Sequence, residues 1–305
     1  MKEASEHKDT SKTTVRDFTS LYSWFILLGV GGTWGSSYFF IKRALVAFDP
    51  MQVGSMRLAL TFLCFIPFAL VRLKTVKSKH WIPLLIVAVC GSSLPAFLFP
   101  IAQTQLSSSF TGVLSSTTPI FTLALGALFF SLKLTRQKVF GVAIGFMGAV
   151  SLIVLAGRGA LEGEPMYALL ACLATAFYAL SSNTINTYLG ELGTIAISSI
   201  AFLIIGVPAT IISLQAGVIE VFKVDDAAWH SFAYVLALAV LGTAMATIFF
   251  FKLIKMSGVV FASTISYIIP CFAVFLGFLD GEPLTWVHAV GMALILCGIY
   301  MTSRR

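Results

Sequence analysis

One stretch of this sequence occurs twice, and it constrains the fold more than any other feature. Residues 110–121 match residues 261–272, with Pro119 and Pro270 at equivalent places. The offset, 270 − 119 = 151, is about half of the 305-residue chain. After a one-residue slip the match resumes, and the glycines at 141 and 148 fall on those at 291 and 298. A self-match at this distance indicates a duplicated unit. Each copy is an apolar span broken by proline, followed by a second span whose glycines predict close helix packing.

The composition indicates that lipid solvates much of the surface. Hydrophobic residues make up 58% of the chain and charged residues 11%, with a mean hydropathy of +0.94. A soluble domain is typically about a quarter charged. The five cysteines all lie inside apolar runs and none has C-x-x-C spacing, so we interpret them as packing residues rather than as disulfides or metal ligands.

Ten apolar segments approach the length of about 20 residues that a membrane helix needs. They are joined by short loops, which leave no room for a separate soluble domain. The polar residues 1–20 lack the apolar core of a signal peptide and are expected to form a disordered cytosolic tail. The predicted spans are Tyr22–Leu45, Pro50–Val71, Trp81–Thr104, Ser109–Phe130, Lys138–Leu155, Met166–Leu189, Thr194–Gln215, Trp229–Leu253, Val259–Leu279 and Thr285–Thr302.

The distribution of basic residues predicts the orientation. With the N-terminus in the cytoplasm, 15 of the 20 lysines and arginines fall on the cytoplasmic side, four fall outside, and Arg57 lies within a span. Such a bias is the positive-inside signal, so both termini are expected to be cytoplasmic. The net charge of +7 then reports topology and predicts no nucleic-acid partner.

Ten spans divide into two units of five, and an odd-numbered unit inserts its second copy upside down. We therefore predict an all-α integral membrane protein with an inverted 5+5 repeat. The first repeat comprises residues 21–157 and the second residues 158–305. Inverted repeats of this kind place a substrate site near the middle of the bilayer and move against each other to give alternating access.

Several motifs in fixed order resemble one family. Residues 33–42 read TWGSSYFFIK, residues 54–58 read GSMRL, and residues 281–285 read GEPLT before the last span. Together with the Pro119 and Pro270 motifs, they resemble the EamA-type branch of the drug/metabolite transporter superfamily from about residue 22 to residue 302. The resemblance implies ten helices, a central cavity and movement of small metabolites, often export of amino acids or related compounds.

Arg57 is the first candidate for a substrate-binding residue. An arginine near the centre of a span costs about 2.5–3.5 kcal/mol on insertion scales, which makes it a functional hypothesis by default. It could pair with an anionic substrate group such as a carboxylate. The alternative is that it reaches the outer interface or binds helix carbonyls.

The broken spans supply further candidates. Prolines within a span free backbone carbonyls, and broken helices at equivalent places in two halves point to a binding site. The alternative is a kink that only shapes the bundle. The first and sixth spans match at an offset of 144, and they contain aromatic, hydroxyl and amide side chains. Such side chains would either suit an amphipathic ligand or join helices. The predicted substrate-binding residues are Trp34, Ser37, Tyr38, Arg57, Ser115, Thr118, Pro119, Tyr178, Asn183, Ser266, Tyr267 and Pro270.

The sequence lacks the motifs of several other classes. No Asp or Glu lies in the middle of a predicted span, so uniport or exchange is expected rather than coupling through a buried carboxylate. There is no P-loop, and neither H-E-x-x-H nor G-x-S-x-G occurs. The competing class is a membrane-embedded hydrolase. It would need Ser92 or Ser93 together with His230 or His288, and both histidines lie at span ends. We expect no enzyme activity, no catalytic residue, no metal and no cofactor.

These observations together predict a secondary transporter that works by alternating access. The expected cargo is a small organic metabolite, foremost an amino acid or its analogue, exported across the cell (inner) membrane by a multi-pass protein. Sugars, nucleosides and phosphorylated metabolites remain the alternative substrates. The expected partners are the substrate and the lipid bilayer, and the protein is expected to act as a monomer or homodimer.

Overall fold

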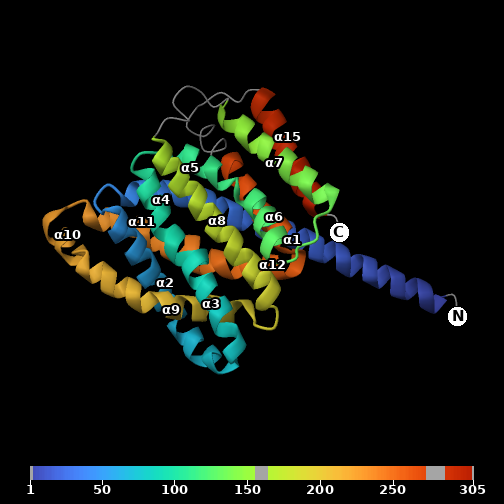
Figure 1. Ribbon diagram of the computed structural model, residues 1–305, viewed down its shortest axis with the longest axis horizontal. Coiled ribbons are helices and arrows are strands. Elements are labelled where there is room, and N and C mark those ends of the chain that lie inside the picture. The colour runs from blue at the N-terminus through green and yellow to red at the C-terminus, as the bar shows by residue number, and fades with distance from the viewer. Residues whose placement is uncertain (1–2, 155–163, 273–285, 304–305) are drawn as a thin grey trace.

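The computed structural model describes residues 3–154, 164–272 and 286–303, and every regular element within these ranges is a helix (Figure 1). Residues 268–272 are also helical. In chain order the elements are α1 (Glu3–Ala44), α2 (Pro50–Arg72), η1 (Leu73–Thr75), η2 (Ser78–His80), α3 (Trp81–Ala88), η3 (Val89–Ser93), α4 (Leu94–Gln103), α5 (Ser108–Ser115), α6 (Thr118–Phe129), α7 (Arg136–Val154), α8 (Pro165–Tyr188), α9 (Thr194–Gln215), α10 (Val218–Val224), α11 (Ala228–Ala239), η4 (Val240–Met245), α12 (Ala246–Ser257), α13 (Val259–Ser263), η5 (Thr264–Tyr267) and α15 (Trp286–Ser303).

Seven helical stretches of the described chain are long and apolar enough to cross a membrane. Two shorter apolar helices cover 259–272 and 289–303. The chain is therefore an all-helical multi-pass membrane protein. The end of the ninth predicted span, the start of the tenth and the proposed boundary between the repeats lie outside the described residues. The seven stretches are Leu21–Ala44, Pro50–Thr75, Ser78–Gln103, Phe110–Phe129, Pro165–Tyr188, Thr194–Gln215 and Ala228–Ser257.

The N-terminal segment differs from the expected disordered tail. Residues 3–20 are helical and continue without interruption into the first span, so that α1 projects from the bundle (Figure 1). The sequence holds no proline or glycine between residues 3 and 28, and nothing local therefore ends the helix.

The start of α2 shows how local sequence fixes a span. Asp49 accepts a hydrogen bond of 2.8 Å from the backbone N–H of Gln52, whose side chain accepts one of 2.9 Å from the N–H of Asp49. This capping box, with Pro50 in the first turn, defines where the helix begins. The Gln52 amide also donates to the Ala216 carbonyl at 2.8 Å and so joins the start of α2 to the end of α9.

Two spans contain a π-helical segment at equivalent places. The first is η3, beginning at Val89, and the second is η4, beginning at Val240. Their offset, 240 − 89 = 151, equals that of the sequence repeat. A π-segment carries a local change in backbone register and often marks a functional site.

Two other spans are interrupted, also at equivalent places. The first break separates α5 from α6 at residues 116 and 117, and the second is the 3₁₀ segment η5. Pro119 lies in the first turn of α6, where its missing N–H costs no hydrogen bond. The breaks meet, because the Ser116 hydroxyl donates to the Ser266 carbonyl at 3.1 Å.

Helices α7 and α15 lie side by side (Figure 1). A Cβ added at Gly141 would lie 2.9 Å from the carbonyl oxygen of Gly298, and one at Gly148 would lie 2.8 Å from that of Gly291. The predicted close packing of these glycines is confirmed. The contacts are reciprocal, since Gly141 matches Gly291 in the sequence repeat and Gly148 matches Gly298.

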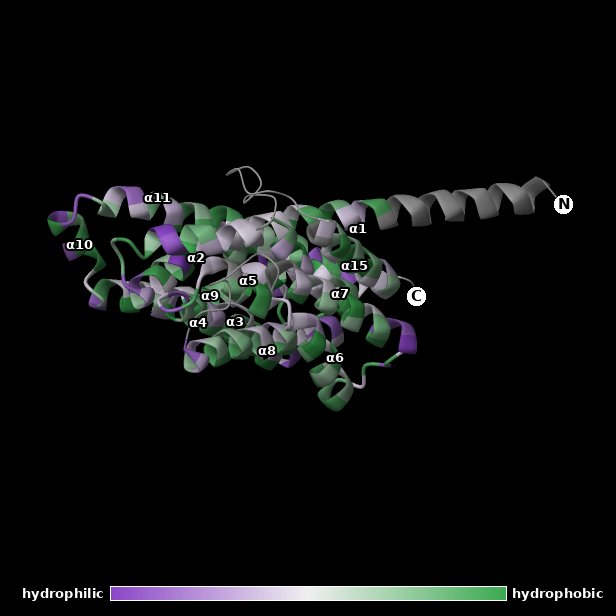
Figure 2. Ribbon diagram, turned by 90° about the horizontal axis from the view of Figure 1, so that it is seen from above, coloured by the Kyte–Doolittle hydropathy of each residue, from purple (hydrophilic) through white to green (hydrophobic). Residues whose placement is uncertain are grey.

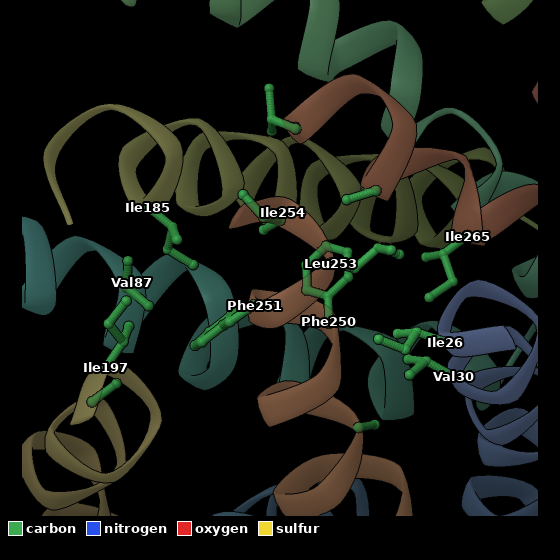
Figure 3. Close-up of a cluster of buried hydrophobic side chains, with 14 of the residues drawn as sticks. Ile26, Val30, Val87, Ile185, Ile197, Phe250, Phe251, Leu253, Ile254 and Ile265 are labelled. Atoms are coloured by element: carbon green, nitrogen blue, oxygen red, sulfur yellow. The ribbon is translucent and has the colours of Figure 1, made fainter. Parts of the chain in front are cut away.

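Apolar side chains fill the interior and also cover much of the outside. Figure 3 shows part of the core, where Phe250 and Leu253 of α12 lie near Ile26 of α1. Figure 2 shows apolar residues along most of the bundle and polar residues mainly near helix ends. Large side chains such as Leu128, 75% exposed, and Ile82, 73% exposed, face outward. Such a surface suits lipid rather than water.

Candidate functional site

A central cavity of about 50 Å³ lies where the interrupted spans meet α1, α2, α8 and α12. Eight of the twelve residues predicted from sequence line it. They come from both halves of the chain and from five of the predicted spans. The eight are Trp34, Ser37, Tyr38, Arg57, Ser115, Thr118, Tyr178 and Ser266.

Arg57 is the only charged side chain among the described residues that line the cavity. It is buried, with 8% exposure, and its Nε donates a hydrogen bond of 2.7 Å to the Thr243 hydroxyl. The guanidinium also interacts with the Tyr178 hydroxyl. It therefore does not reach for the membrane interface. No carboxylate of the described chain lies within 4.0 Å of it, so its charge has no protein counter-ion there.

Aromatic rings form one wall of the cavity. Trp34 and Tyr178 are nearly parallel, with ring centroids 6.3 Å apart and an interplanar angle of 12°. Phe99 stacks on Tyr178 at 5.9 Å, and Phe250 contacts Trp34 at 4.9 Å. The Trp34 indole N–H donates to the Gly242 carbonyl at 3.0 Å, which fixes the ring against η4. This wall offers flat apolar surface to the body of a ligand.

Hydroxyl groups at the helix breaks form another part of the lining. Ser115 donates to the Gly112 carbonyl at 2.5 Å, Thr118 to the Ser115 carbonyl at 2.6 Å, and Ser266 to the Ser263 carbonyl at 3.1 Å. Their protons are thus used within the protein, while their oxygen lone pairs remain available as acceptors. Arg57 is then the strongest hydrogen-bond donor of the lining.

Four predicted residues do not line the cavity. Asn183 is buried elsewhere, because its amide donates to the carbonyls of Thr122 and Ala179 at 3.1 and 3.0 Å and joins α8 to α6. Tyr267 turns toward α7, where its hydroxyl donates to the Val142 carbonyl at 2.7 Å. Pro119 and Pro270 are buried beside the breaks. Both prolines affect the cavity only by shaping the backbone at the breaks, because neighbouring residues supply the side chains that line it.

Six lining residues lie outside the set predicted from sequence. Two of them, Phe99 and Phe250, can be recognised from the sequence as an equivalent pair. They are 250 − 99 = 151 residues apart, which is the offset of the repeat. Applying the offset to the third and eighth spans would have paired them. Ile269 likewise lies 269 − 118 = 151 residues after the predicted Thr118, whereas Ile41 and Ile265 carry no such signal, because apolar residues fill every span. The six are Ile41, Phe99, Phe250, Ser263, Ile265 and Ile269.

Comparison with known proteins identifies the family. The EamA-like transporter family model matches twice, over residues 21–154 and 165–304. The chain belongs to this family. The expected resemblance is therefore confirmed, and the chain is a multi-pass membrane protein of a transporter family.

Two relatives of this family member are similar over most of their length, and a third over about half. The uncharacterized inner membrane transporter YedA of Escherichia coli (strain K12) is 26% identical over 291 residues, covering 94% of this chain and 90% of that protein. An uncharacterized transporter of Archaeoglobus fulgidus is 23% identical, covering 92% of this chain and 99% of that protein. A probable amino-acid metabolite efflux pump of Salmonella typhimurium is 26% identical over 168 residues, or 53% of this chain and 52% of the pump.

One solved structure supports the fold alone. A protein known from its crystal structure aligns with a TM-score of 0.68 at 16% sequence identity. The alignment covers 92% of this chain and 96% of that one. The two proteins therefore share a fold.

Proposed function

We propose that this family member is a secondary transporter that moves small organic metabolites across the cell membrane by alternating access, through uniport or exchange. The proposed cargo carries a carboxylate, foremost an amino acid or an analogue, and the proposed direction is export. The observation that carries this proposal is the buried Arg57 guanidinium, which lines the central cavity with no carboxylate of the described chain within 4.0 Å. A buried charge without a counter-ion is costly, and a bound anion would compensate it.

An inverted repeat of ten helices is the proposed framework. The double match of the family model supports it, as do the π-segments at an offset of 151 and the reciprocal contacts of Gly141 with Gly298 and Gly148 with Gly291. A two-fold relation between halves maps the first of these contacts onto the second.

The proposed orientation has both termini in the cytoplasm. Loops predicted on the same side do contact each other. Lys79 pairs with Glu191 at 2.6 Å at one end of the molecule, and Lys255 donates to the carbonyls of Gly190 and Leu192 there. At the other end, the Ser231 hydroxyl donates to the Arg43 carbonyl at 3.1 Å. These contacts support the predicted division of the loops between two ends of the molecule, and the positive-inside count carries the proposal that the first end is cytoplasmic.

The cavity size fits a transporter in a contracted state. A volume of about 50 Å³ has room for only a few water molecules. The spans that surround it must therefore separate to admit a substrate. The breaks beside Pro119 and Pro270 and the π-segments η3 and η4 are the places where the backbone can yield.

Counterflow in proteoliposomes tests the proposal. Vesicles are loaded with one unlabelled metabolite at a time, amino acids first, and uptake of the labelled compound is followed. We expect exchange by the wild type and its loss in Arg57→Ala. Arg136→Ala is the matched control, since Arg136 is exposed at the start of α7 and lies outside the cavity. It should exchange like the wild type.

The outcomes separate the parts of the proposal. Exchange that survives in Arg57→Ala would leave a transporter in which the arginine is structural. If folded protein exchanges no amino acid, the proposal of an amino-acid cargo is contradicted. Sugars, nucleosides and phosphorylated metabolites are then tested in the same assay. An absence of exchange with every class would contradict the transport proposal itself.

A further inference from the structure

A second cavity, of about 480 Å³, lies at the rim of the molecule that carries the α2–α3 and α8–α9 loops. No residue lines both this rim cavity and the central one. Its walls come from the segment between Arg72 and His80 and from residues 191–196, which include the first turn of α9.

The N-terminus of α9 supplies backbone donors to the rim cavity. Gly193 is the N-cap of this 22-residue helix and offers no side-chain acceptor. The first turn of a helix leaves N–H groups without intrahelical partners, and the helix dipole places partial positive charge there. Thr194, Ile195 and Ala196 of this turn line the cavity.

His80 is a buried donor that lacks an acceptor in the same cavity. Its exposure is 1%, and its Nδ1 accepts a hydrogen bond of 3.2 Å from the Lys77 N–H, so the proton of the neutral ring is on Nε2. That Nε2 is buried and has no hydrogen-bond partner. The Oε2 atom of Glu191 is 3.6 Å away, beyond hydrogen-bonding distance.

Two cations of the rim cavity are weakly neutralised. Arg72 has no ion pair within 4.0 Å among the described residues, and the Lys77 Nζ lies 4.0 Å from Glu191. The carboxylate of Glu191 binds Lys79 at 2.6 Å, but its side chain is 59% exposed. Exposed ion pairs contribute little to stability, so this carboxylate can turn toward water.

We propose that the rim cavity binds a phosphate-type anion, either the headgroup of a phospholipid or a soluble phosphate ester. Arg72, Lys77, the His80 imidazole N–H and the N-terminus of α9 are its donors, and Glu191 occupies the site when the anion is absent. Helix N-termini with Arg and Lys beside them suit the several acceptor oxygens of a phosphate group. The site does not depend on what the central cavity transports.

Full-length protein tests this site in two arms. In detergent, inorganic phosphate is titrated by calorimetry. In the second arm, phosphatidylglycerol that stays bound after delipidation is counted by native mass spectrometry. Because charged hydrogen bonds are among the stronger ones, Arg72→Gln should weaken binding about tenfold in the arm that represents the true source. Glu191→Gln should instead tighten binding, since it removes the competing carboxylate.

Lys74→Gln is the matched control, because Lys74 is exposed on η1, carries the same charge and does not line the rim cavity. It should bind like the wild type. An effect of Arg72→Gln in the phosphate arm alone assigns a soluble ligand, and one in the lipid arm alone assigns a headgroup. Equal behaviour of Arg72→Gln and Lys74→Gln in both arms, or weaker binding by Glu191→Gln, would overturn the proposal. Lys77→Gln replaces Arg72→Gln if the latter does not fold.

Discussion

Arg57 of α2 and Thr243 of η4 are joined by a hydrogen bond of 2.7 Å from the guanidinium Nε to the threonine hydroxyl. Thr243 in turn donates to the carbonyl of Leu238 at 2.8 Å, five residues earlier, which is the spacing of a π-helix. The π-segment thus holds the hydroxyl that orients the arginine. At the repeat offset of 144 the position equivalent to Arg57 is Ala201, so only one half carries the charge.

We expect Thr243→Val to raise the KM for transported substrate about tenfold, the cost of one hydrogen bond to a charged group. The arginine would lose the partner that orients it while the size of the side chain is kept. Thr243→Ser keeps the hydroxyl and should restore the KM. Initial counterflow rates over a range of substrate concentrations measure both. An equal KM for the valine and serine variants would mean that the contact does not position Arg57.

Gly298→Ala should lower the free energy of unfolding by about 1–3 kcal/mol, the usual cost of overpacking. The new Cβ would lie 2.5 Å from both the Gly141 carbonyl oxygen and the Gly145 nitrogen, and backbone atoms cannot easily move. Gly29→Ala is the control, because no atom lies within 4 Å of its added Cβ. It should leave stability unchanged or raise it slightly, since alanine favours the helix. Thermal unfolding followed by tryptophan fluorescence compares the two variants.

Asn183→Leu should reduce stability without changing the substrate KM. Its amide joins α8 to the Thr122 carbonyl of α6 and does not line the central cavity. Interhelical hydrogen bonds in membranes contribute about 0.6 kcal/mol on average, so the loss should be small. Melting temperature and counterflow KM are measured on the same preparation. A rise in KM at unchanged stability would return Asn183 to the binding site.

The ion pair of Glu191 should respond to pH. The hydrogen bond and charge of Lys79 hold the pKa of the Glu191 carboxyl below its ordinary value. A lowered pKa in the folded state adds stability above the ordinary glutamate pKa, and this is lost as pH falls through the lowered one. The melting temperature of wild type should slightly exceed that of Glu191→Gln near neutral pH and equal it in strong acid. Because the pair is exposed, high salt should remove the difference as well.

The repeat allowed much of the cavity lining to be predicted from sequence, but one pair of equivalent residues lies outside that prediction. Trp34 and Tyr178 were matched at an offset of 144, and both line the cavity. Phe99 and Phe250 are equivalent at an offset of 151 and also line the cavity, but neither belongs to the predicted set. In an apolar span an isolated phenylalanine looks like any other lipid-facing or core residue. Only the equivalence of two positions distinguishes it.

Adjacent residues at the second break show the opposite limit. Ser266 lines the central cavity, whereas Tyr267 points to the Val142 carbonyl of α7. Successive side chains of a 3₁₀ helix, such as η5, are turned by about 120°, so neighbours in sequence face different partners. Both residues are polar, so the sequence predicts both as substrate-binding residues. The position of α7 determines that Tyr267 bonds to that helix and does not line the cavity.

The sequence by itself determined that this is a membrane protein of repeated apolar spans, because span length and self-similarity are properties of the linear chain and of the bilayer thickness. It also identified Arg57 as exceptional, since a charge within a span is costly wherever the helices pack. Only the tertiary structure decided that Thr243 orients this arginine and that Phe99 and Phe250 complete the aromatic wall. These contacts join residues far apart in the chain, and they depend on how the helices rotate and cross as they pack.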